Sequence, residues 1–425
     1  MSLVEVHSAA VQAVAGGIHA VSQSCSAFAS TQGAWRFFHN RRITLPILAE
    51  PVIEFARGEC DLVCQDYILA VHDWSQLMYA RHVGKKDRVS LSSTHVPEGY
   101  EILATLLVSD REGFPIAPVE IGVRAADGIH CSRSEKVLAA VSPLDELLHV
   151  MEHVEQLMLP RPLVHIIDAE ADSVDHYRQW DAAGHLFLVR ADDRIVDHGG
   201  IEKRCAAIQV ELRQQDRLKY TRDVLYHGKK ARQFVGEVPV MLTRPGQRNR
   251  PGVGDRQRIP GPRLALRLII SEVRDLKGTL LATWFLLTNV LNVSCAQIAL
   301  WYYWRWNIET FFKLLKSAGL QLEQWQQESA DAIARRLWIA CMACVSVWQL
   351  ARNTQPIAQQ ARELLVRLSG RQMKHKVSFT LPALLAGLWT LLTMLETLEH
   401  YTLDELRALA HVALPQRFPT QPPDV

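Results

Sequence analysis

The stretch WYYWRWNIETFFKLLKSAGLQLE, residues 301–323, carries the most informative pattern of chemically active side chains in the chain. Tyr302, Arg305, Glu309 and Lys316 stand at offsets of 0, 3, 7 and 14 residues. At about 100° per residue, these four positions fall within a stripe roughly 60° wide on one side of an α-helix. The pattern therefore predicts a helix that presents one acid among cations and an aromatic hydroxyl.

We expect this helix to begin near Ser294 and to end near Ala318, with two different faces. Trp306 and Lys313 extend the functional stripe, and the other face is suited to packing through Trp304, Ile308, Phe311, Phe312 and Leu315. An ordinary amphipathic helix explains the two faces, but it does not require an acid flanked by Arg, Lys, Tyr and Trp. That combination suits a metal-binding carboxylate that acts on a phosphodiester chain.

Two further acids follow apolar runs of strand length. Residues 66–73 (DYILAVHD) end in Asp73, and residues 163–168 (LVHIID) end in Asp168. A strand that ends in Asp places a carboxylate at the rim of a sheet, although an Asp there can equally be a helix cap or a turn residue. Together with Glu309, these carboxylates could hold a pair of Mg²⁺ ions, because hard cations take oxygen ligands. Two ions about 3.5–4 Å apart serve phosphoryl transfer.

The helical signature resembles that of the insertion-sequence-four family of DDE transposases. The spacing Tyr302-x2-Arg305-x3-Glu309-x6-Lys316 matches the tyrosine–arginine–glutamate–lysine motif of that family. The surrounding residues 301–323 resemble its third catalytic block.

Two more stretches carry the same resemblance. DAEADSVDHYRQW, followed by FLVRADDR, resembles the second block of the family with Asp168 as its acid. TQGAWRFFHNRRIT resembles the stretch before the first block, and Asp73 lies about where the first acid belongs. The resemblance covers roughly residues 20–350.

The resemblance implies a fold and an activity. The fold is of the α/β class: a ribonuclease H-like core with an inserted β-rich domain, flanked by helical N- and C-terminal regions. The activity is cut-and-paste transposition by a homodimer, through strand nicking, a hairpin on the transposon end, hairpin opening and strand transfer. The implied partners are double-stranded DNA, as terminal inverted repeats and as target, and two Mg²⁺ ions that Mn²⁺ replaces. The implied location is the cytoplasm of a bacterium, at the nucleoid.

The resemblance also assigns roles to single residues. Asp73, Asp168 and Glu309 become the catalytic metal ligands. Trp284, in TWFLLTN, resembles the family's indole that stacks on a flipped base, although an apolar strand can also bury it. Contacts to DNA are expected from the remaining side chains of the stripe: Tyr302, Arg305, Lys313, Lys316 and Trp306.

The same reading divides the chain into five parts. We expect a helical N-terminal DNA-binding region at residues 1–58. The core is expected in two pieces, at residues 59–199 and 291–352, with the inserted β domain between them at residues 200–290. A helical region suited to dimerisation is expected at residues 353–425. Within the first core piece, strands at 102–109 and 116–124 are predicted to form a hairpin, since a turn-like spacer separates them. Ser142 followed by Pro143 predicts a helix start.

Several arginines give weaker signals. Arg190 and Arg194 follow a core strand and are candidate phosphate contacts, as are Arg36 and Arg41 in the N-terminal region. Residues 244–263 are rich in Arg, Gly and Pro, which predicts a mobile loop that could follow a DNA backbone. A solvated surface explains each of these features about as well.

The composition limits the alternatives. With Lys+Arg 47 against Asp+Glu 45 the chain is not globally basic, so any DNA surface must come from local clustering. Eight Cys are too few for a disulfide framework, and the seventeen His suggest no ligand set. The apolar stretches 337–350 and 381–395 are shorter than the ~18 residues of a membrane span. They predict buried helices, no membrane contact and a reducing, cytoplasmic setting.

Two other functions fit parts of the sequence. Members of the family usually begin with a basic helix that precedes the segment aligned with residues 3–25. A chain that lacks it would act as a catalytically incompetent DNA-binding or dimerising inhibitor of transposition. A ribonuclease H-like nuclease would share the metal site but would form no hairpin.

Overall fold

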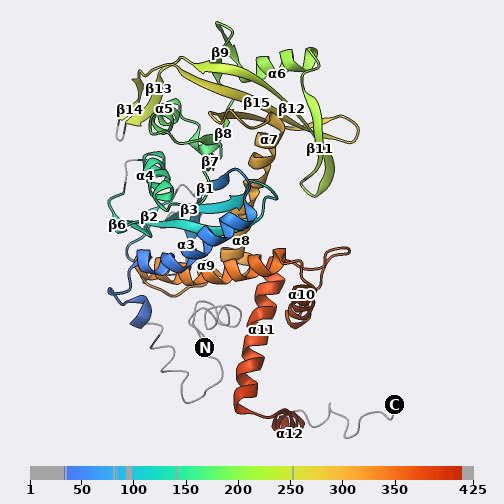
Figure 1. The fold of residues 1–425 in the computed structure, drawn as a ribbon. Helices are drawn as coiled ribbons and strands as arrows, with labels where there is room; N and C mark the ends of the chain where they lie inside the picture. The colour runs from blue at the N-terminus through green and yellow to red at the C-terminus, as the bar shows by residue number, and fades with distance from the viewer. Residues whose placement is uncertain are drawn as a thin grey trace. The chain divides into compact units, whose positions relative to one another are not determined.

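The computed structural model describes residues 33, 36–79, 82, 84–91, 98–139, 142–250 and 253–413, with the backbone alone at 248–250, 253–256, 317–318 and 413. The chain divides into two compact units (Figure 1). The large unit comprises Thr44–Phe312 and Glu328–Trp338, and the small unit comprises Met1–Ile43, Lys313–Gln327 and Ile339–Val425. The boundary expected between residues 58 and 59 falls inside helix α3 (Leu45–Val63).

A single mixed sheet organises the large unit. In its described part the sheet has 14 strands in the order β10-β9-β12-β15-β16-β8-β7-β1-β3-β4-β5-β6, with β11 beside β12 and β2 beside β3. The strands are β1 (Ile68–Met78), β2 (Val89–Ser90), β3 (Glu98–Ser109), β4 (Pro115–Ala125), β5 (Gly128–Cys131), β6 (Glu135–Val137), β7 (Leu163–Ile167), β8 (Phe187–Ala191), β9 (Ile195–His198), β10 (Ile201–Arg204), β11 (Lys219–Tyr226), β12 (Lys229–Leu242), β15 (Leu264–Asp275) and β16 (Leu280–Thr288).

The direction of the strands changes at β1. On one side, β1 pairs antiparallel with β3, and β3 pairs antiparallel with β4, so the hairpin predicted from the sequence is confirmed. On the other side, β1 pairs parallel with β7, and β7 pairs parallel with β8. These central strands are buried on both faces, which explains their nearly continuous apolar sequence.

The region expected as an inserted β domain is joined to the core sheet. Strand β16 pairs with β8, and β15, β12, β11 and β10 extend the same sheet outward. It also contains a helix that the sequence analysis did not predict, α6 (Cys205–Gln214).

The loop expected at residues 244–263 contains a two-stranded hairpin instead. β13 (Gly246–Arg250) and β14 (Val253–Ile259) pair antiparallel in a separate small sheet. Its base rests on helix α5 (Val174–Ala182), where Arg178 donates from Nη2 to the carbonyl oxygen of Arg244 at 3.0 Å. The expectation was wrong because this Arg- and Gly-rich segment lacks the apolar alternation by which strands are recognised.

Side-chain caps begin two of the helices that pack on the sheet, α3 and α4. The hydroxyl of Ser142 accepts the N–H of Asp145 and starts α4 (Pro143–Gln156), as predicted. Thr44 caps α3 in the same way, and α3 packs on β4 (Figure 1). Both helices carry Pro in the first turn, where the missing N–H costs nothing.

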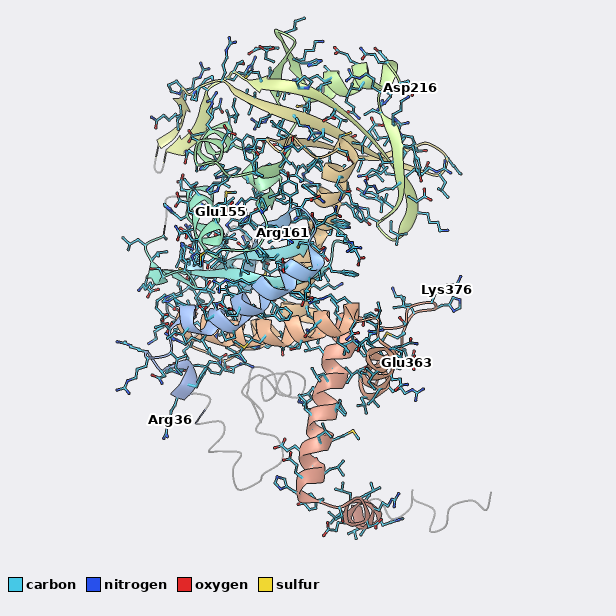
Figure 2. All side chains as sticks on the ribbon, in the orientation of Figure 1. Arg36, Glu155, Arg161, Asp216, Glu363 and Lys376 are labelled. Atoms are coloured by element: carbon cyan, nitrogen blue, oxygen red, sulfur yellow. The ribbon has the colours of Figure 1, made fainter. Side chains whose placement is uncertain are left out.

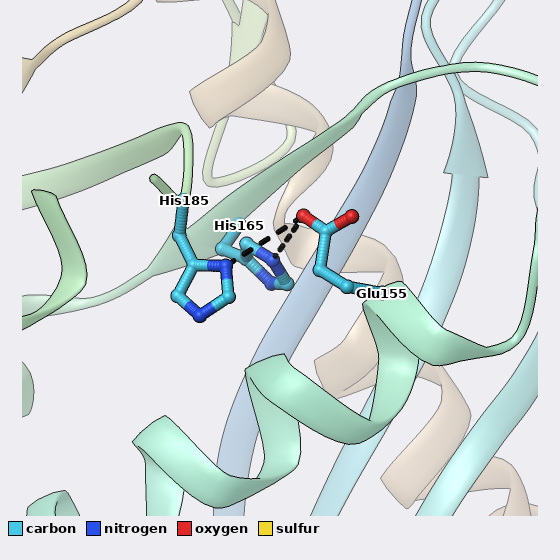
Figure 3. Close-up of side chains that lie close together, drawn as sticks. All are labelled: Glu155, His165 and His185. Atoms are coloured by element: carbon cyan, nitrogen blue, oxygen red, sulfur yellow. Dashed lines mark hydrogen bonds and ion pairs between the residues drawn. The ribbon is translucent and has the colours of Figure 1, made fainter. Parts of the chain in front are cut away.

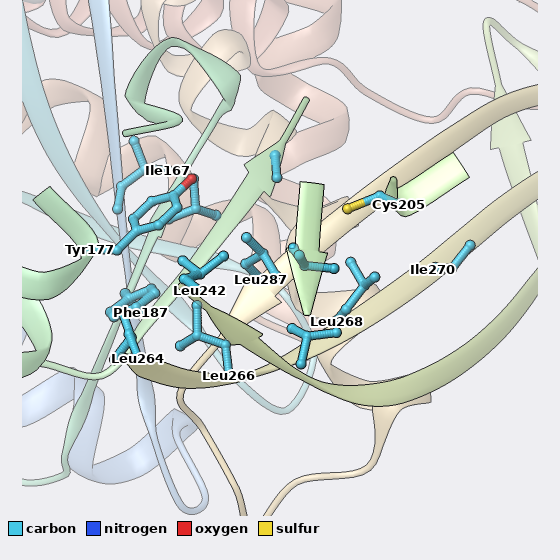
Figure 4. Packing of buried hydrophobic residues seen from close by; sticks show 14 of the residues in the cluster. Ile167, Tyr177, Phe187, Cys205, Leu242, Leu264, Leu266, Leu268, Ile270 and Leu287 are labelled. Atoms are coloured by element: carbon cyan, nitrogen blue, oxygen red, sulfur yellow. The ribbon is translucent and has the colours of Figure 1, made fainter. Parts of the chain in front are cut away.

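The main apolar core lies where β7, β8, β12, β15 and β16 meet helices α4, α5 and α6 (Figure 4). Ile167, Phe187 and Leu268 from the sheet are completely buried there, as is Tyr177 from α5. Each such side chain contributes roughly 1.5–3 kcal/mol through burial. The carboxyl end of β7, which Ile167 forms, is therefore held by tightly packed neighbours.

The long helix predicted between Ser294 and Ala318 is interrupted at Arg305. α7 (Cys295–Trp304) ends there and α8 (Trp306–Lys313) follows, after which a π-helical turn (Leu314–Ala318) continues the chain. The side-chain amide of Asn307 donates to the carbonyl oxygen of Trp304 at 2.8 Å and replaces a backbone partner. A constant 100° per residue therefore does not hold across the segment.

The small unit is helical in its described part, as expected for the C-terminal region. It contains the end of α9 (Ala330–Arg352), α10 (Pro356–Leu368), α11 (Leu381–His400) and α12 (Leu403–Ala413). Gly387 lets α11 approach α10 closely, because a Cβ there would lie 1.9 Å from the carbonyl oxygen of Leu365.

Helix α11 is longer and less buried than the sequence predicted. Its first residues, including Leu384 and Leu385, are buried, whereas Met394, Leu395 and Leu398 are exposed. By length and composition alone, it is the one helix among the described residues that could span a membrane. Since the core helix of a soluble protein can pass the same test, this is weak support for a membrane span.

Candidate active site

Asp73 and Asp168 occupy matching positions on neighbouring parallel strands. The register of β1 and β7 runs from Ile68 opposite Leu163 to Val71 opposite Ile166. Each Asp lies two residues beyond this last pair, so both belong to the same face of the sheet. Neighbouring strands lie about 4.8 Å apart, which brings the two carboxylates into one site.

The sequence analysis was wrong about where the first strand ends. β1 continues past Asp73 to Met78, because β3 pairs with it along its whole length. On the opposite edge β7 ends at Ile167, and this leaves the flank of β1 at Asp73 uncovered. Asp73 therefore lies within the strand and is 9% exposed, beside the part of β1 that β7 does not cover.

Arg305 joins two of the three predicted acids. Its Nη1 donates to Oδ2 of Asp73 at 3.2 Å, and its Nη2 donates to Oε1 of Glu309 at 2.6 Å. Arg305 is 5% exposed, so these charge-assisted bonds lie in a poorly solvated place. The interruption of the helix at this residue leaves Arg305 and Glu309 four positions apart and still on one side.

The electrostatics of Asp73 reflect a crowded group of carboxylates. Burial is the main cause that raises its pKa to about 7, and the charges of Asp168 and Glu309 raise it further. Arg305 and the N–H of Trp74 lower it and offset only part of this effect. A cation bound among these oxygens would relieve the same repulsion.

Asp168 also caps a short helix. Its Oδ1 accepts the N–H of Glu170 at 2.8 Å at the start of a 3₁₀ turn (Ala169–Ala171). The cap is thus observed, and the metal-ligand role of Asp168 stays a prediction that its second carboxylate oxygen allows. The nearby Asp172 is bound by the hydroxyl of Tyr177 and by Arg194, each at 2.5 Å, so Arg194 has a structural role.

Tyr302 borders the acids with its ring against Trp284. The two ring centroids lie 5.7 Å apart, and both side chains are buried. Burial raises the pKa of Tyr302, while the charges of Arg305 and Arg190 lower it. Arg190 itself is half-buried on β8. These residues thus surround the acids with donors and one aromatic pair.

An aromatic cavity of about 520 Å³ opens beside this group. Trp284, Trp304 and Trp306 line it, together with Phe114 and Tyr226. Trp306 is 46% exposed and Trp284 is 7% exposed, so Trp306 is the more accessible of the two indoles. The cavity is large enough for a flat aromatic guest.

The other predicted DNA contacts lie in the small unit. Lys313 is exposed, and Lys316 is half-buried with its Nζ 3.7 Å from Oε1 of Glu323. Burial lowers the pKa of Lys316. Arg36, labelled in Figure 2, and Arg41 are both exposed.

One cluster was missed by the sequence analysis. Glu155, His165 and His185 place one ligand atom each within 4.8 Å of one another (Figure 3), a group that the expectation of no ligand set among the histidines did not include. The three residues come from different parts of the chain and share no motif. A local pattern could not have found them.

Comparison with known proteins supports a transposase. Residues 137–345, which include Asp168 and Glu309, match the family described as "Transposase DDE domain". The match supports a DDE transposase, and with it DNA transposition and an endonuclease of the DDE type. No curated protein matches the sequence.

One solved structure shows a weak likeness. It is described as "Cryo-EM structure of piggyBac transposase synaptic complex with hairpin DNA (SNHP)", with 10% sequence identity and a TM-score of 0.36. The alignment covers 85% of this chain and 59% of that chain. The chain therefore spans little more than half the length of that transposase.

Proposed function

We propose that the chain is a cut-and-paste DNA transposase of the insertion-sequence-four type, related in its motifs to the transposon-five transposase. The observation that carries this proposal is the meeting of Asp73, Asp168 and Glu309, which come from β1, the end of β7 and α8. Three carboxylates with an arginine bound among them suit phosphoryl transfer better than a purely structural role.

The strand order supports a ribonuclease H-like core. In the order β4-β3-β1-β7-β8, three antiparallel strands are followed by two strands parallel to β1. The first two acids then lie on the central strand and its parallel neighbour. The remaining strands between β8 and α7 form the insertion, which extends this sheet.

The three acids have the donor chemistry for divalent cations. All three offer hard oxygen ligands, and a metal would offset the smaller part of the raised pKa of Asp73 that comes from the charges of Asp168 and Glu309 and not from burial. Two Mg²⁺ ions, or Mn²⁺ in their place, would supply an activated oxygen nucleophile and stabilise the leaving oxygen. Asp73, Asp168 and Glu309 would hold them.

The arginine and tyrosine beside the acids are proposed to hold the scissile phosphate. Nε of Arg305 is buried and has no hydrogen-bond partner among the described residues, so a phosphate oxygen could satisfy it. Tyr302 limits the motion of the guanidinium, whose centre lies 5.8 Å from its ring. The resemblance adds Lys313, Lys316, Arg190, Arg36 and Arg41 as contacts to DNA.

The aromatic cavity suits a base turned out of the duplex. A hairpin intermediate leaves a distorted end, and stacking of an unpaired base on an aromatic ring contributes roughly 1–3 kcal/mol. Trp284 and Trp306 line the cavity from β16 and α8. We therefore assign base capture to these two indoles.

The partners in this proposal are double-stranded DNA and a second copy of the chain. Terminal inverted repeats and target DNA would be brought together by a homodimer in the bacterial cytoplasm. Residues 1–58 would contribute to recognition of the ends, and residues 353–425 would contribute to dimerisation.

The test is cleavage of a plasmid that carries the element's own terminal repeats. Wild type is compared with Glu309→Gln in Mg²⁺ and in Ca²⁺, and hairpin ends are resolved on a denaturing gel. The control is Glu152→Gln, which changes an exposed Glu on α4. Hairpins in Mg²⁺ that are lost only in Glu309→Gln support the proposal. Binding without cleavage would indicate an inhibitor, and cleavage without hairpins would indicate a nuclease.

A further inference from the structure

The cluster of Glu155, His165 and His185 lies on the other face of the sheet from the acids. His72 precedes Asp73 on β1, and successive side chains of a strand point to opposite faces. His72 contacts His165, with Nε2 of the former 2.8 Å from Nδ1 of the latter. The cluster is thus separate from the three carboxylates of the candidate active site.

The distances within the cluster fit a tetrahedral ion. Oε1 of Glu155 lies 3.4 Å from Nε2 of His165 and 3.7 Å from Nδ1 of His185. Ligand bonds of about 2.0–2.1 Å at tetrahedral angles separate neighbouring ligand atoms by about 3.3–3.4 Å. The two spacings from Glu155 need to shrink by only a few tenths of an ångström, and all three ligand atoms lie within 4.8 Å of one another.

We propose that Glu155, His165 and His185 form a zinc-type metal site. Two imidazole nitrogens and one carboxylate oxygen suit Zn²⁺, whereas Mg²⁺ and Ca²⁺ require mostly oxygen ligands. Three protein ligands leave a fourth position for water. The site therefore takes a different class of metal from the carboxylates around Arg305.

The ligands are held by rigid parts of the core. His165 is fully buried on β7, and its backbone N–H donates to the carbonyl oxygen of Leu186 at 2.8 Å. His185 is fixed in the turn after α5 by its own backbone N–H, which donates to Trp180. Glu155, near the end of α4, has a side chain that is 39% exposed, so solvent reaches the cluster at this residue.

The hydrogen bonds around the cluster are compatible with both the metal-free and the metal-bound state of the site. Without metal, the carboxylate of Glu155 only accepts, so Nε2 of His165 carries the proton and its Nδ1 accepts from His72. The hydroxyl of Thr105, 2.9 Å from Nδ1 of His72, completes the chain as a donor.

Metal binding reverses this chain without changing the number of protons on it. Nε2 of His165 would then bind the ion, Nδ1 of His165 would donate to His72, and His72 would donate to Thr105. A metal-bound histidine normally donates its second N–H to such a partner. His72 and Thr105 are positioning residues that orient His165.

At His185 the nitrogen that faces the cluster is Nδ1, 3.7 Å from Oε1 of Glu155. Its other nitrogen, Nε2, is buried and has no hydrogen-bond partner among the described residues. Coordination of an ion by His185 would therefore use Nδ1.

The test uses Co²⁺ as a spectroscopic probe on the full chain after removal of metal. Wild type is expected to bind one Co²⁺ with the intense visible absorption of a tetrahedral site, and Zn²⁺ should displace it. Glu155→Gln and His185→Gln should bind Co²⁺ at least about 100-fold more weakly, since loss of an outer partner alone costs about 10–100-fold. Glu152→Gln and Glu309→Gln should retain the absorption.

Thr105→Val tests the orientation of His165 separately. It removes the hydroxyl with little change of shape, and Co²⁺ affinity is expected to fall by about 10–100-fold while the tetrahedral spectrum persists. Circular dichroism of every variant checks the fold, and His185→Gln keeps the test valid if Glu155→Gln does not fold. Absence of a tetrahedral spectrum in wild type, or its persistence in both ligand variants, would overturn the proposal.

Discussion

The guanidinium of Arg305 donates to the carboxylate of Asp73 at 3.2 Å and so joins residues 232 positions apart in the sequence. The same side chain donates to Glu309. Arg305 therefore occupies carboxylate oxygens that a divalent cation would use. In the proposed enzyme, metal and phosphate would bind together. The metal would bind to the acids, which would then release Arg305, and Arg305 would bind the phosphate.

Arg305→Gln is expected to raise metal affinity and to lower the rate of cleavage. Removal of the cation leaves Asp73 and Glu309 uncompensated, so Mn²⁺ should bind about tenfold more tightly, or ~1.4 kcal/mol. Loss of the phosphate contact should slow cleavage by roughly 10²–10³, as for loss of one oxyanion donor. Electron paramagnetic resonance of Mn²⁺ and single-turnover cleavage measure the two effects.

Arg305→Lys is the matched variant because it keeps the charge and loses the planar fork. It should leave Mn²⁺ affinity near that of wild type and still slow cleavage. Weaker Mn²⁺ binding in Arg305→Gln would mean that Arg305 supports the metal site and does not compete for it.

Asp73→Asn is expected to stabilise the metal-free protein, and more so at high pH. The pKa of Asp73 is about 7 in the folded chain, whereas its ordinary value is 3.8. Between pH 3.8 and pH 7, the folded state therefore holds a proton that the unfolded state has released. The free energy of unfolding of wild type thus falls as pH rises from about 4 to 7, by at most ~4 kcal/mol from this group. Asparagine has no such dependence.

Urea unfolding in EDTA at pH 5 and pH 8 measures this difference. The gain of Asp73→Asn over wild type should be larger at pH 8, whereas Glu152→Gln on the exposed side of α4 should show no such trend. An equal gain at both pH values would show that Asp73 is not held protonated by its surroundings.

Much of the candidate site was visible in the sequence. Asp73 and Asp168 each follow an apolar run, and this indicates a carboxylate at the rim of a sheet correctly for Asp168 but not for Asp73, which lies inside β1. The spacing of Arg305 and Glu309 places them one turn apart on any helix. Local periodicity of this kind persists even where the helix is interrupted.

The rest depended on partners that a local pattern does not contain. The strand β1 extends past Asp73 because β3 pairs with it along its whole length. Glu155 and His185 meet only after β7 and β8 pair side by side. Each of these contacts joins residues that the sequence alone leaves unrelated.

Gly113→Ala is expected to destabilise the large unit and to disturb the α7–α8 junction. Gly113 has a φ of +72°, and a Cβ there would lie 2.4 Å from the indole of Trp304. Backbone strain costs about 1 kcal/mol, and displacement of the indole should raise the total to roughly 2–4 kcal/mol. The side-chain amide of Asn307 donates to the carbonyl oxygen of Gly113, so a shift of Gly113 would also disturb α8. Because α8 carries Glu309, cleavage should fall as well.

Gly184→Ala is the matched control for this substitution. Gly184 has a similar φ of +83° but no heavy atom within 4 Å of the added Cβ. It should lose only about 1 kcal/mol, from strain. If urea unfolding shows the same loss of free energy of unfolding in both variants, the Trp304 indole moves aside without a cost in stability.

Trp306→Ala and Trp284→Ala separate base capture from folding. Trp306 is 46% exposed in the aromatic cavity, so its loss should change the free energy of unfolding by less than ~1 kcal/mol. Binding of an end with an unpaired base should weaken by about 1–3 kcal/mol, and binding of a fully paired duplex should not change. Trp284 is buried against Tyr302, and its truncation should also cost about 3–5 kcal/mol of stability. Fluorescence anisotropy with paired and unpaired ends measures the difference, and equal weakening on both substrates would place Trp306 against the DNA backbone and not against a base.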